Sequence, residues 1–370
     1  MDDRTREAID LMDRFAERTG LTSSRPSRRY LWTDAFAVMT DIGLHEVTGE
    51  HRFLERALDL VDAVHHTLGR HRDDDRREGW LSGLDEAEGE RHPTRGGLRI
   101  GKRRPERRRG EALDPTTEWD SDGQYFHYLT RWMQALDRAA RATADGRYAL
   151  WARELCETAA AAFVHRGGPH ARPSIVWKMS IDLSRALVPT TGQHDALDGY
   201  VTARQLETTR RELGPDAEPP VLVEIATELY DLIDARDLPT TDPLGIGGLL
   251  LDAAILDQID PGAPLCADLL ASARAGLRIG VRHLGLAGPA ATRLAFREFG
   301  LAIGLAAAVD RFGAVHDGAP LREDIENFWR EPRAQRSPTW LEHEDINAVM
   351  LAASLAPRGV IDRPARFAPH

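Results

Sequence analysis

Several ingredients are scarce in this chain of 370 residues, and each scarcity argues against a class of protein. Cysteine occurs only as Cys156 and Cys266, without a CxxC pair or the spacing of metal ligands. A disulfide framework and a cysteine-based metal site are therefore not expected, and we expect both thiols to be buried as small hydrophobic groups in a reduced compartment. No residue pattern indicates a metal or an organic cofactor, so we predict that the protein uses neither.

Long apolar runs and an excess of positive charge are also missing. The first residues lack the apolar core of a signal peptide, and no stretch has the length of a membrane span, so the sequence predicts a cytoplasmic protein with no membrane partner. The formal net charge is -11, whereas proteins that bind nucleic acid are usually basic, so we expect no nucleic-acid partner. Nothing in the sequence fixes an oligomeric state.

Signals for β-strands are scarce as well, because the spacing of apolar residues is helical nearly throughout. Six predicted helices are apolar on most sides: 30–42, 123–143, 174–187, 244–258, 291–310 and 343–356. Six others have one charged face: 3–19, 50–69, 146–165, 219–235, 264–280 and 321–330. A helix that is apolar all round is buried and one with a charged stripe is peripheral, so the alternation predicts two concentric rings of helices in a single domain, residues 1–370. Gly43 is expected to end its helix, and the segment 195–213 is an extra element.

Two segments and this alternation resemble one known superfamily. The segments are 29–36 (RYLWTDAF) and 122–127 (DGQYFH). Together with the twelve-helix alternation they are similar to the six-hairpin glycosidases, the (α/α)6-toroid superfamily that also includes sugar 2-epimerases. The resemblance implies an all-α (α/α)6 barrel and a carbohydrate-active enzyme, but its motifs are specific for the fold and not for a substrate.

Polar and aromatic residues gather where the predicted inner helices begin. The long segment 71–122 precedes one of these helices, and long loops over a rigid scaffold commonly build sites. Helix amino termini favour anionic or hydroxyl-rich ligands, while aromatic rings stack on sugars and carboxylates accept hydrogen bonds from hydroxyl groups. We therefore predict a small, polar, sugar-like substrate at this rim. The candidate binding residues are Trp32, Asp120, Gln124, Tyr125, His127, Trp177, Lys178, Asp242, His343 and Asp345.

The main hypothesis is a glycoside hydrolase that uses two carboxyl groups, one to protonate the leaving oxygen and one to activate water. We predict Asp122 and Glu344 as this pair, with Asp34 assisting. Each acid also has a plainer interpretation, because a single carboxylate at a helix start can simply cap the helix.

Two segments outside the predicted helix starts are also candidates for the site. Residues 96–102 are predicted to form a lid or site-lining hairpin from which Arg99 or Lys102 reaches an anionic group. Asp195, in the polar stretch 193–199, either caps the extra segment at the opposite rim or is brought to the site by it. The sequence leaves these two positions of Asp195 open.

Three alternatives to hydrolysis remain. A sugar epimerase or isomerase would use His127 and His343 for proton exchange, since imidazole titrates near neutral pH. A non-catalytic barrel would bind the same ligand without turnover. A terpene-cyclase-like enzyme would use the helical cavity, but the low aromatic content (6%) and the charged rim disfavour it.

Overall fold

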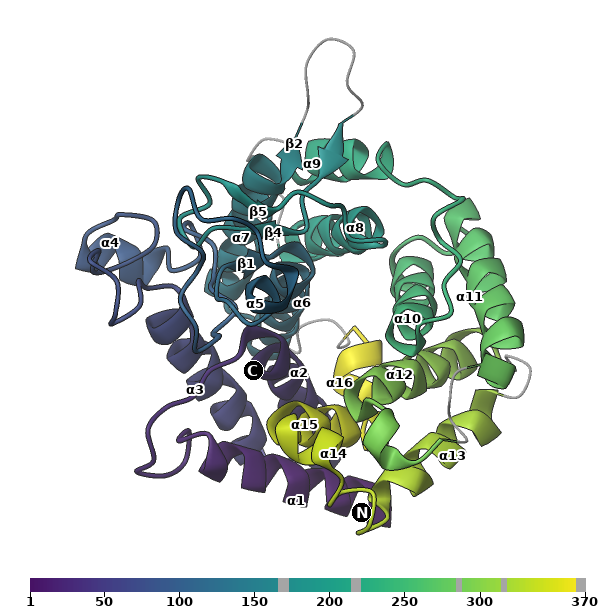
Figure 1. Cartoon of the computed structure of the whole chain (residues 1–370). Helices are drawn as coiled ribbons and strands as arrows, with labels where there is room; N and C mark the ends of the chain where they lie inside the picture. Colours follow the sequence, from purple (N-terminus) through teal and green to yellow (C-terminus); the bar gives the residue numbers. More distant parts are fainter. Residues whose placement is uncertain (166–172, 214–220, 284–287, 314–317, 364–370) are drawn as a thin grey trace. The chain divides into compact units, whose positions relative to one another are not determined.

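The computed structural model describes residues 1–165, 173–213, 221–283, 288–313 and 318–363, and most of them are helical (Figure 1). The longer helices are α1 (Asp3–Arg18), α2 (Leu31–Thr48), α3 (His51–Leu68), α6 (Phe126–Thr143), α7 (Gly146–Phe163), α8 (Asp195–Leu213), α9 (Val221–Tyr230), α10 (Pro243–Ile259), α11 (Pro264–His283), α12 (Ala295–Phe312), α13 (Gly318–Arg330) and α15 (Glu344–Leu355). The short ones are α4 (Glu86–Arg91), α5 (Pro115–Trp119), η1 (Ala290–Thr292), α14 (Pro338–Glu342) and α16 (Arg358–Ile361). Five short strands are β1 (Gln124–Tyr125), β2 (Val164–His165), β3 (Ser174–Ile175), β4 (Lys178–Met179) and β5 (Ala186–Val188). No helix in these described ranges is long and apolar enough to cross a bilayer.

The described residues fall into two compact units. The first contains those of Met1–Arg18, Met39–Glu55 and Asp234–Ala365, and the second contains those of Thr19–Val38 and Arg56–Ile233. Helices α2 and α3 each contribute to both units. The single domain predicted from the sequence stays a prediction.

Two kinds of helix alternate along the chain, as the apolar spacing predicts. Helices α2, α6, α8, α10, α12 and α15 are buried over most of their length. In α15, for example, every residue from Asn347 to Leu355 is buried. Between them come helices that bury one face, as α1 does with Ala8, Met12 and Phe15. The burial of apolar area on one stripe or on all sides decides which kind each sequence forms.

The helix predicted over 174–187 is wrong. This segment carries β3, β4 and β5, and β4 pairs antiparallel with β1 on one side and with β5 on the other. Between β4 and β5 the Asp182 carboxylate accepts hydrogen bonds from the Ser180 and Ser184 hydroxyl groups and from the Ser184 N–H, while Leu183 has a positive φ of 56°. Short polar side chains that bind their own backbone compete with a helix, and here they form a turn.

The helix lost at 174–187 is replaced by the segment 195–213. Helix α8 covers it and is one of the buried helices, not an extra element. The amino terminus of α8 therefore belongs to the same series of buried helix starts as the predicted site. This corrects the helix order on which the position of Asp195 depended.

Gly43 does not end its helix, because α2 continues to Thr48. A Cβ at Gly43 would lie 2.4 Å from the amide nitrogen of Gly359, and one at Gly359 would lie 1.8 Å from the carbonyl oxygen of Met39. These two glycines therefore allow α2 and α16 to touch through their backbones. Glycine here serves close approach and not termination.

Helices α6 and α8 pack against each other, in parallel, through a row of buried polar contacts that we call the α6–α8 ladder. Its hydrogen-bonded pairs are Arg131–Asp198, Gln134–Thr202, Asp137–Gln205 and Arg141–Thr209. Partners are separated by 67 residues in the first pair and by 68 in the others. A constant separation means that the two helices run in the same direction in a fixed register. Their first turns are therefore neighbours.

Candidate functional site

An imidazole and a carboxyl group meet where α6 and α8 begin. His127 is the second residue of α6 and Asp195 is the first of α8, one step above the α6–α8 ladder. His127 Nδ1 lies 3.6 Å from Asp195 Oδ1, which is longer than a hydrogen bond. Within the described chain, neither His127 Nδ1 nor Asp195 Oδ2 has a hydrogen-bond partner although both atoms are buried. The pair therefore has protons and lone pairs to offer to a ligand.

Burial sets the protonation of both groups. Loss of solvation, reinforced by the neighbouring Asp198 carboxylate, holds the pKa of Asp195 well above its usual range. The same loss of solvation lowers the pKa of His127 to about 4. Asp195 thus keeps its proton to a higher pH than an ordinary aspartate, while the imidazole is neutral at neutral pH. One proton donor and one proton acceptor stand side by side.

Aromatic rings surround the imidazole. We call Trp32, Tyr125, His127, Tyr128 and Trp177 the aromatic cluster. The His127 ring stacks on Trp177 with a 6.4 Å centroid separation and an 8° interplanar angle, and on Tyr125 at 5.4 Å and 25°. Trp32 and Tyr128 meet it edge-on, with centroids at 6.0 and 4.9 Å. Such rings present flat apolar faces together with polar edges.

Two donors in the aromatic cluster are also unused. Trp32 Nε1 and the Tyr125 hydroxyl are buried, and neither finds a hydrogen-bond partner among the residues the structure describes. A buried polar group without a partner costs about 1–3 kcal/mol. Together with His127 and Asp195 they give four unpaired polar atoms on residues in one contact network, which a hydroxyl-rich ligand could satisfy.

Asp122 has no such freedom. Its side chain is fully buried, and Oδ2 accepts hydrogen bonds from Arg99 (2.8 Å) and Arg72 (3.1 Å). Oδ1 accepts from the amides of Gly101 (3.0 Å) and Lys102 (3.3 Å). These contacts hold the long segment 71–122 against the start of β1. The geometry favours an anchoring role, and the catalytic role predicted for Asp122 stays untested.

Gln124 and Lys178 are also occupied by the backbone around them. The Gln124 amide accepts from Leu98 N–H and donates to the carbonyl oxygens of Gly96 and Ile181. Lys178 Nζ donates to the carbonyl oxygens of Glu118 (2.6 Å) and Ser121 (2.8 Å) and pairs with the Glu118 carboxylate at 2.9 Å. Burial lowers the pKa of Lys178, which its bond to Glu118 partly offsets. Both side chains are fully buried and are already hydrogen-bonded to the surrounding backbone.

The segment 96–102, predicted to be a lid or a site-lining hairpin, is largely buried. Leu98 and Ile100 are fully buried, and the Leu31 N–H donates to the Ile100 carbonyl oxygen. Arg99 is buried and donates to Asp122 and to the carbonyl oxygens of Arg70 and Thr67. Lys102 Nζ donates to the Trp119 carbonyl oxygen at 2.5 Å. These contacts fix the segment within the second unit, and the anionic group that Arg99 binds is the protein's own Asp122 carboxylate. A role for Arg99 or Lys102 in binding a ligand stays a prediction.

Asp34 and Asp120 are placed differently from each other. Asp34 is buried and paired with Arg29 at 3.3 Å, and it accepts from the Tyr30 N–H at 2.8 Å at the start of α2. That arrangement is a helix-start contact rather than a free acid. Asp120 is exposed next to the end of α5. No comparison tests a role for either.

The remaining predicted residues lie in the first unit. Asp242 caps α10 by accepting from the Gly245 N–H, and it also accepts from Arg297 Nη1 at 2.6 Å. Arg18 binds Glu344 at 2.9 Å and Asp345 at 2.5 Å. The His343 ring meets Phe296 edge-on with centroids 5.7 Å apart. The pairing of Glu344 with Asp122 is a prediction that nothing tests.

No family model matches the chain, and no curated protein does. Solved structures do match, over nearly the whole chain. A family 76 α-mannanase from Bacteroides thetaiotaomicron is 9% identical, with 96% of each chain covered and a TM-score of 0.61. An inactive variant of an α-1,6-mannanase of Salegentibacter sp. HEL1_6, in complex with α-1,6-mannotriose, is 12% identical and covers 96% of this chain and 99% of its own, with a TM-score of 0.58. A sugar epimerase from a ruminal bacterium is 10% identical, covers 97% and 98%, and has a TM-score of 0.58.

The chain has the (α/α)6-toroid fold. The resemblance to the six-hairpin superfamily is confirmed at the level of the fold. In that fold the buried helices are the inner ones, and α8 supplies the member that the sequence prediction had misplaced at 174–187.

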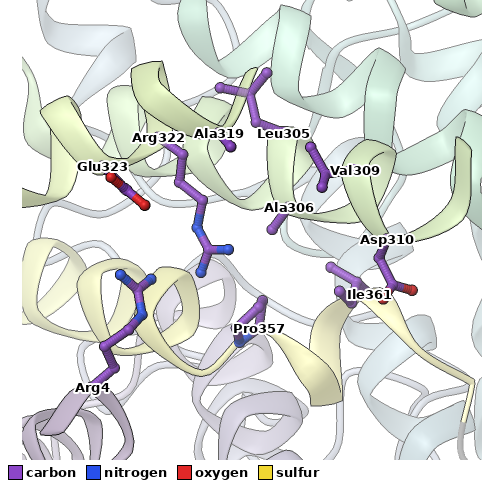
Figure 2. A pocket seen from close by; sticks show the side chains of 10 residues that line it. All are labelled: Arg4, Leu305, Ala306, Val309, Asp310, Ala319, Arg322, Glu323, Pro357 and Ile361. Carbon is purple, nitrogen blue, oxygen red and sulfur yellow. The ribbon is translucent and has the colours of Figure 1, made fainter. Parts of the chain in front are cut away.

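A separate cavity of about 400 Å³ lies in the first unit (Figure 2). Arg4 and Arg322 point toward one another in it, and both bind the buried Glu326 carboxylate. Its apolar wall includes Leu305 and Val309, toward the carboxyl end of α12. None of the predicted site residues lines it, and its two arginines are already paired with the Glu326 carboxylate. The aromatic cluster is therefore the better candidate.

Sequence reasoning gave no role to Tyr128 and Asp198. Tyr128 belongs to the aromatic cluster and shares a hydrogen bond of 2.7 Å with the Tyr30 hydroxyl. Asp198 pairs with Arg131 and raises the pKa of Asp195. A signal for α8 was present, because its polar residues at 198, 202, 205 and 209 recur every three or four positions, as they do on α6 at 131, 134, 137 and 141.

Proposed function

We propose that the protein is a carbohydrate-active enzyme whose sugar site is the aromatic cluster together with Asp195. The half-buried rings of Tyr128 and Trp177 offer faces for the apolar side of a sugar, and the four unpaired polar atoms offer partners for its hydroxyl groups. The fold supports the proposal because the similar structures include an α-1,6-mannanase holding mannotriose, a sugar epimerase and a D-mannose isomerase.

The reaction that we propose first is glycoside hydrolysis with Asp195 as the proton donor. The observation that carries it is a carboxyl group with a raised pKa and an unpaired Oδ2 among aromatic rings. Asp195 would give its proton to the glycosidic oxygen as the bond from the anomeric carbon to that oxygen breaks. A water molecule would add its oxygen to the anomeric carbon and lose a proton to a second carboxylate. Asp195 takes the place first predicted for Asp122.

The test is release of reducing ends from a panel of mannosides and glucosides. We expect Asp195→Asn to lower kcat by about 10²–10⁴-fold, because an amide cannot donate the proton of a general acid. Asp231→Asn, which changes an exposed acid in the same unit, should leave kcat unchanged. Full turnover by Asp195→Asn would remove Asp195 from the role.

The second candidate is a sugar epimerase or isomerase with His127 as the base. The neutral imidazole and the unpaired Nδ1 favour it. His127 would take a proton from the carbon next to the carbonyl group of an open-chain sugar and return it, on the same face, to the neighbouring carbon, as isomerisation requires. Epimerisation would need a second group that donates a proton from the opposite face. Deuterium from solvent would then enter the sugar, whereas hydrolysis incorporates none at carbon. Tight binding with neither reaction would instead support a non-catalytic barrel.

A further inference from the structure

One more aromatic ring, that of Trp119, lies next to the aromatic cluster. A single sugar unit bound in the cluster would not require it. Trp119, the last residue of α5, lies with its ring centroid 5.4 Å from that of Trp177 and 6.5 Å from that of Tyr125. Trp177 in turn stacks on His127. The three rings of His127, Trp177 and Trp119 therefore form a row that leads from the His127–Asp195 pair to the surface.

Trp119 is the exposed end of this row. Half of its surface (51%) is open to solvent, whereas Tyr125 is only 2% exposed. Exposing a large aromatic ring forgoes a considerable gain from burial. An aromatic face kept open at the edge of a site is available to stack on a ligand.

The segment that carries Trp119 is fixed in place. Lys178 Nζ holds the carbonyl oxygens of Glu118 and Ser121, on either side of the tryptophan. Lys102 Nζ holds the carbonyl oxygen of Trp119 itself and lies 5.4 Å from the ring centroid. A backbone fixed before binding loses little conformational entropy when a ligand docks. The two lysines of the chain thus act on the same short segment.

A hydroxyl-binding group lies beside the ring. Asp120 follows Trp119 directly and is exposed, so its carboxylate can accept hydrogen bonds from a bound ligand. An open aromatic face with an adjacent free-standing acceptor has the composition of a further sugar subsite.

We propose that Trp119 is the platform of a second subsite, and that the substrate class is a disaccharide or longer glycoside rather than a free monosaccharide. The inference rests on the proposed function, because it assumes that one sugar ring occupies the aromatic cluster. The next ring of the chain stacks on Trp119, and Lys102 and Lys178 act as positioning residues for it.

The experiment compares binding of one ring with binding of two, measured by calorimetry in the Asp195→Asn background so that no ligand is consumed. The probes are methyl mannoside against α-1,6-mannobiose, and methyl glucoside against cellobiose. For at least one pair we expect the disaccharide to bind about 3- to 10-fold more tightly, as one added aromatic stacking contact predicts. Trp119→Ala should remove this gain and leave monosaccharide affinity unchanged, while Trp119→Phe should keep most of it.

Tyr230→Ala is the matched control, because Tyr230 is an equally exposed aromatic residue (50%) in the same unit. It should keep the gain in full. Equal affinity for one ring and two, or an equal loss of both affinities in Trp119→Ala, overturns the second subsite. Failure to turn over any glycoside overturns hydrolysis but does not alter this comparison, so the two proposals fail separately. Binding of none of the four probes overturns the subsite together with the sugar site.

Discussion

Replacing Asp122 tests whether this residue stabilises the fold or takes part in catalysis. Its carboxylate faces four donors, which are the guanidinium groups of Arg72 and Arg99 and two backbone amides. In Asp122→Ala, both guanidinium groups lose this partner while their side chains remain only 13% and 8% exposed. Removing one member of a buried ion pair costs about 3–5 kcal/mol. With an m-value of about 3 kcal/mol/M, the urea midpoint should fall by about 1–1.7 M.

Asp122→Asn should not rescue the protein, for a geometric reason. Both oxygens of Asp122 face donors only, whereas an amide has one accepting oxygen and one donating nitrogen. Either orientation of the amide therefore turns a donor toward donors. We expect its midpoint to lie between those of the wild type and Asp122→Ala.

The control uses the same arginine and the same loop. Asp74 also binds Arg72, at 2.6 and 2.9 Å, but its side chain is 53% exposed. An exposed ion pair contributes about 0–1 kcal/mol, so Asp74→Ala should barely move the midpoint. An Asp122→Ala protein that keeps the wild-type midpoint but loses turnover by 10²-fold or more would refute the anchoring argument and restore Asp122 as a catalytic residue.

Three further predictions follow from the packing and the charges. Gly247→Ala should lower the free energy of unfolding in urea by about 1–3 kcal/mol, because its Cβ would lie 2.1 Å from a carbonyl oxygen of α12. Gly248→Ala is the control: its Cβ would meet nothing within 4 Å, so the change should be neutral or mildly stabilising. Because the pKa of His127 is about 4 when folded and about 6.5 when unfolded, the unfolded state binds more protons between these values, and stability should fall as the pH drops through that window. His127→Gln should flatten the curve by up to about 3 kcal/mol, and an unchanged pH profile of midpoints would contradict the lowered pKa. Lys178→Met should cost about 3–5 kcal/mol, because Glu118 Oε1 and two buried carbonyl oxygens lose their donor although Arg107 still pairs with Glu118 Oε2; an unchanged urea midpoint would show that the buried pair does not stabilise the fold.

The fold could be predicted from local pattern because burial acts residue by residue. A helix such as α15 is apolar on every side and α1 on one stripe, and that difference is visible in the sequence itself. The helix prediction at 174–187 was wrong because distant contacts, and not the local pattern, determine the structure of this segment. What decides this segment is the pairing of β4 with β1, more than fifty residues earlier, and a turn around Asp182, neither of which leaves a period in the local sequence.

The position of the candidate site could be inferred from the sequence more readily than the state of each residue in it. The segment 118–128 does supply most of the aromatic cluster, as the concentration of polar and aromatic residues indicated. What the sequence could not show is which acid has a partner. Asp122 is held by arginines 23 and 50 residues before it in the chain, and Asp195 reaches the imidazole only because the α6–α8 ladder fixes the register of two helices.

The buried polar groups near the aromatic cluster differ in whether they have hydrogen-bond partners. Asp122, Gln124 and Lys178 each have hydrogen-bond partners within the protein. Their hydrogen bonds therefore stabilise the fold and are not available to a ligand. Four atoms of the site, on Trp32, Tyr125, His127 and Asp195, have no hydrogen-bond partner in the described part of the chain, and each costs about 1–3 kcal/mol as it stands. A ligand that pairs them recovers that cost, and one that lacks hydroxyl groups does not. In the proposed sugar site, the four unpaired atoms therefore favour a polyhydroxylated ligand over an apolar one.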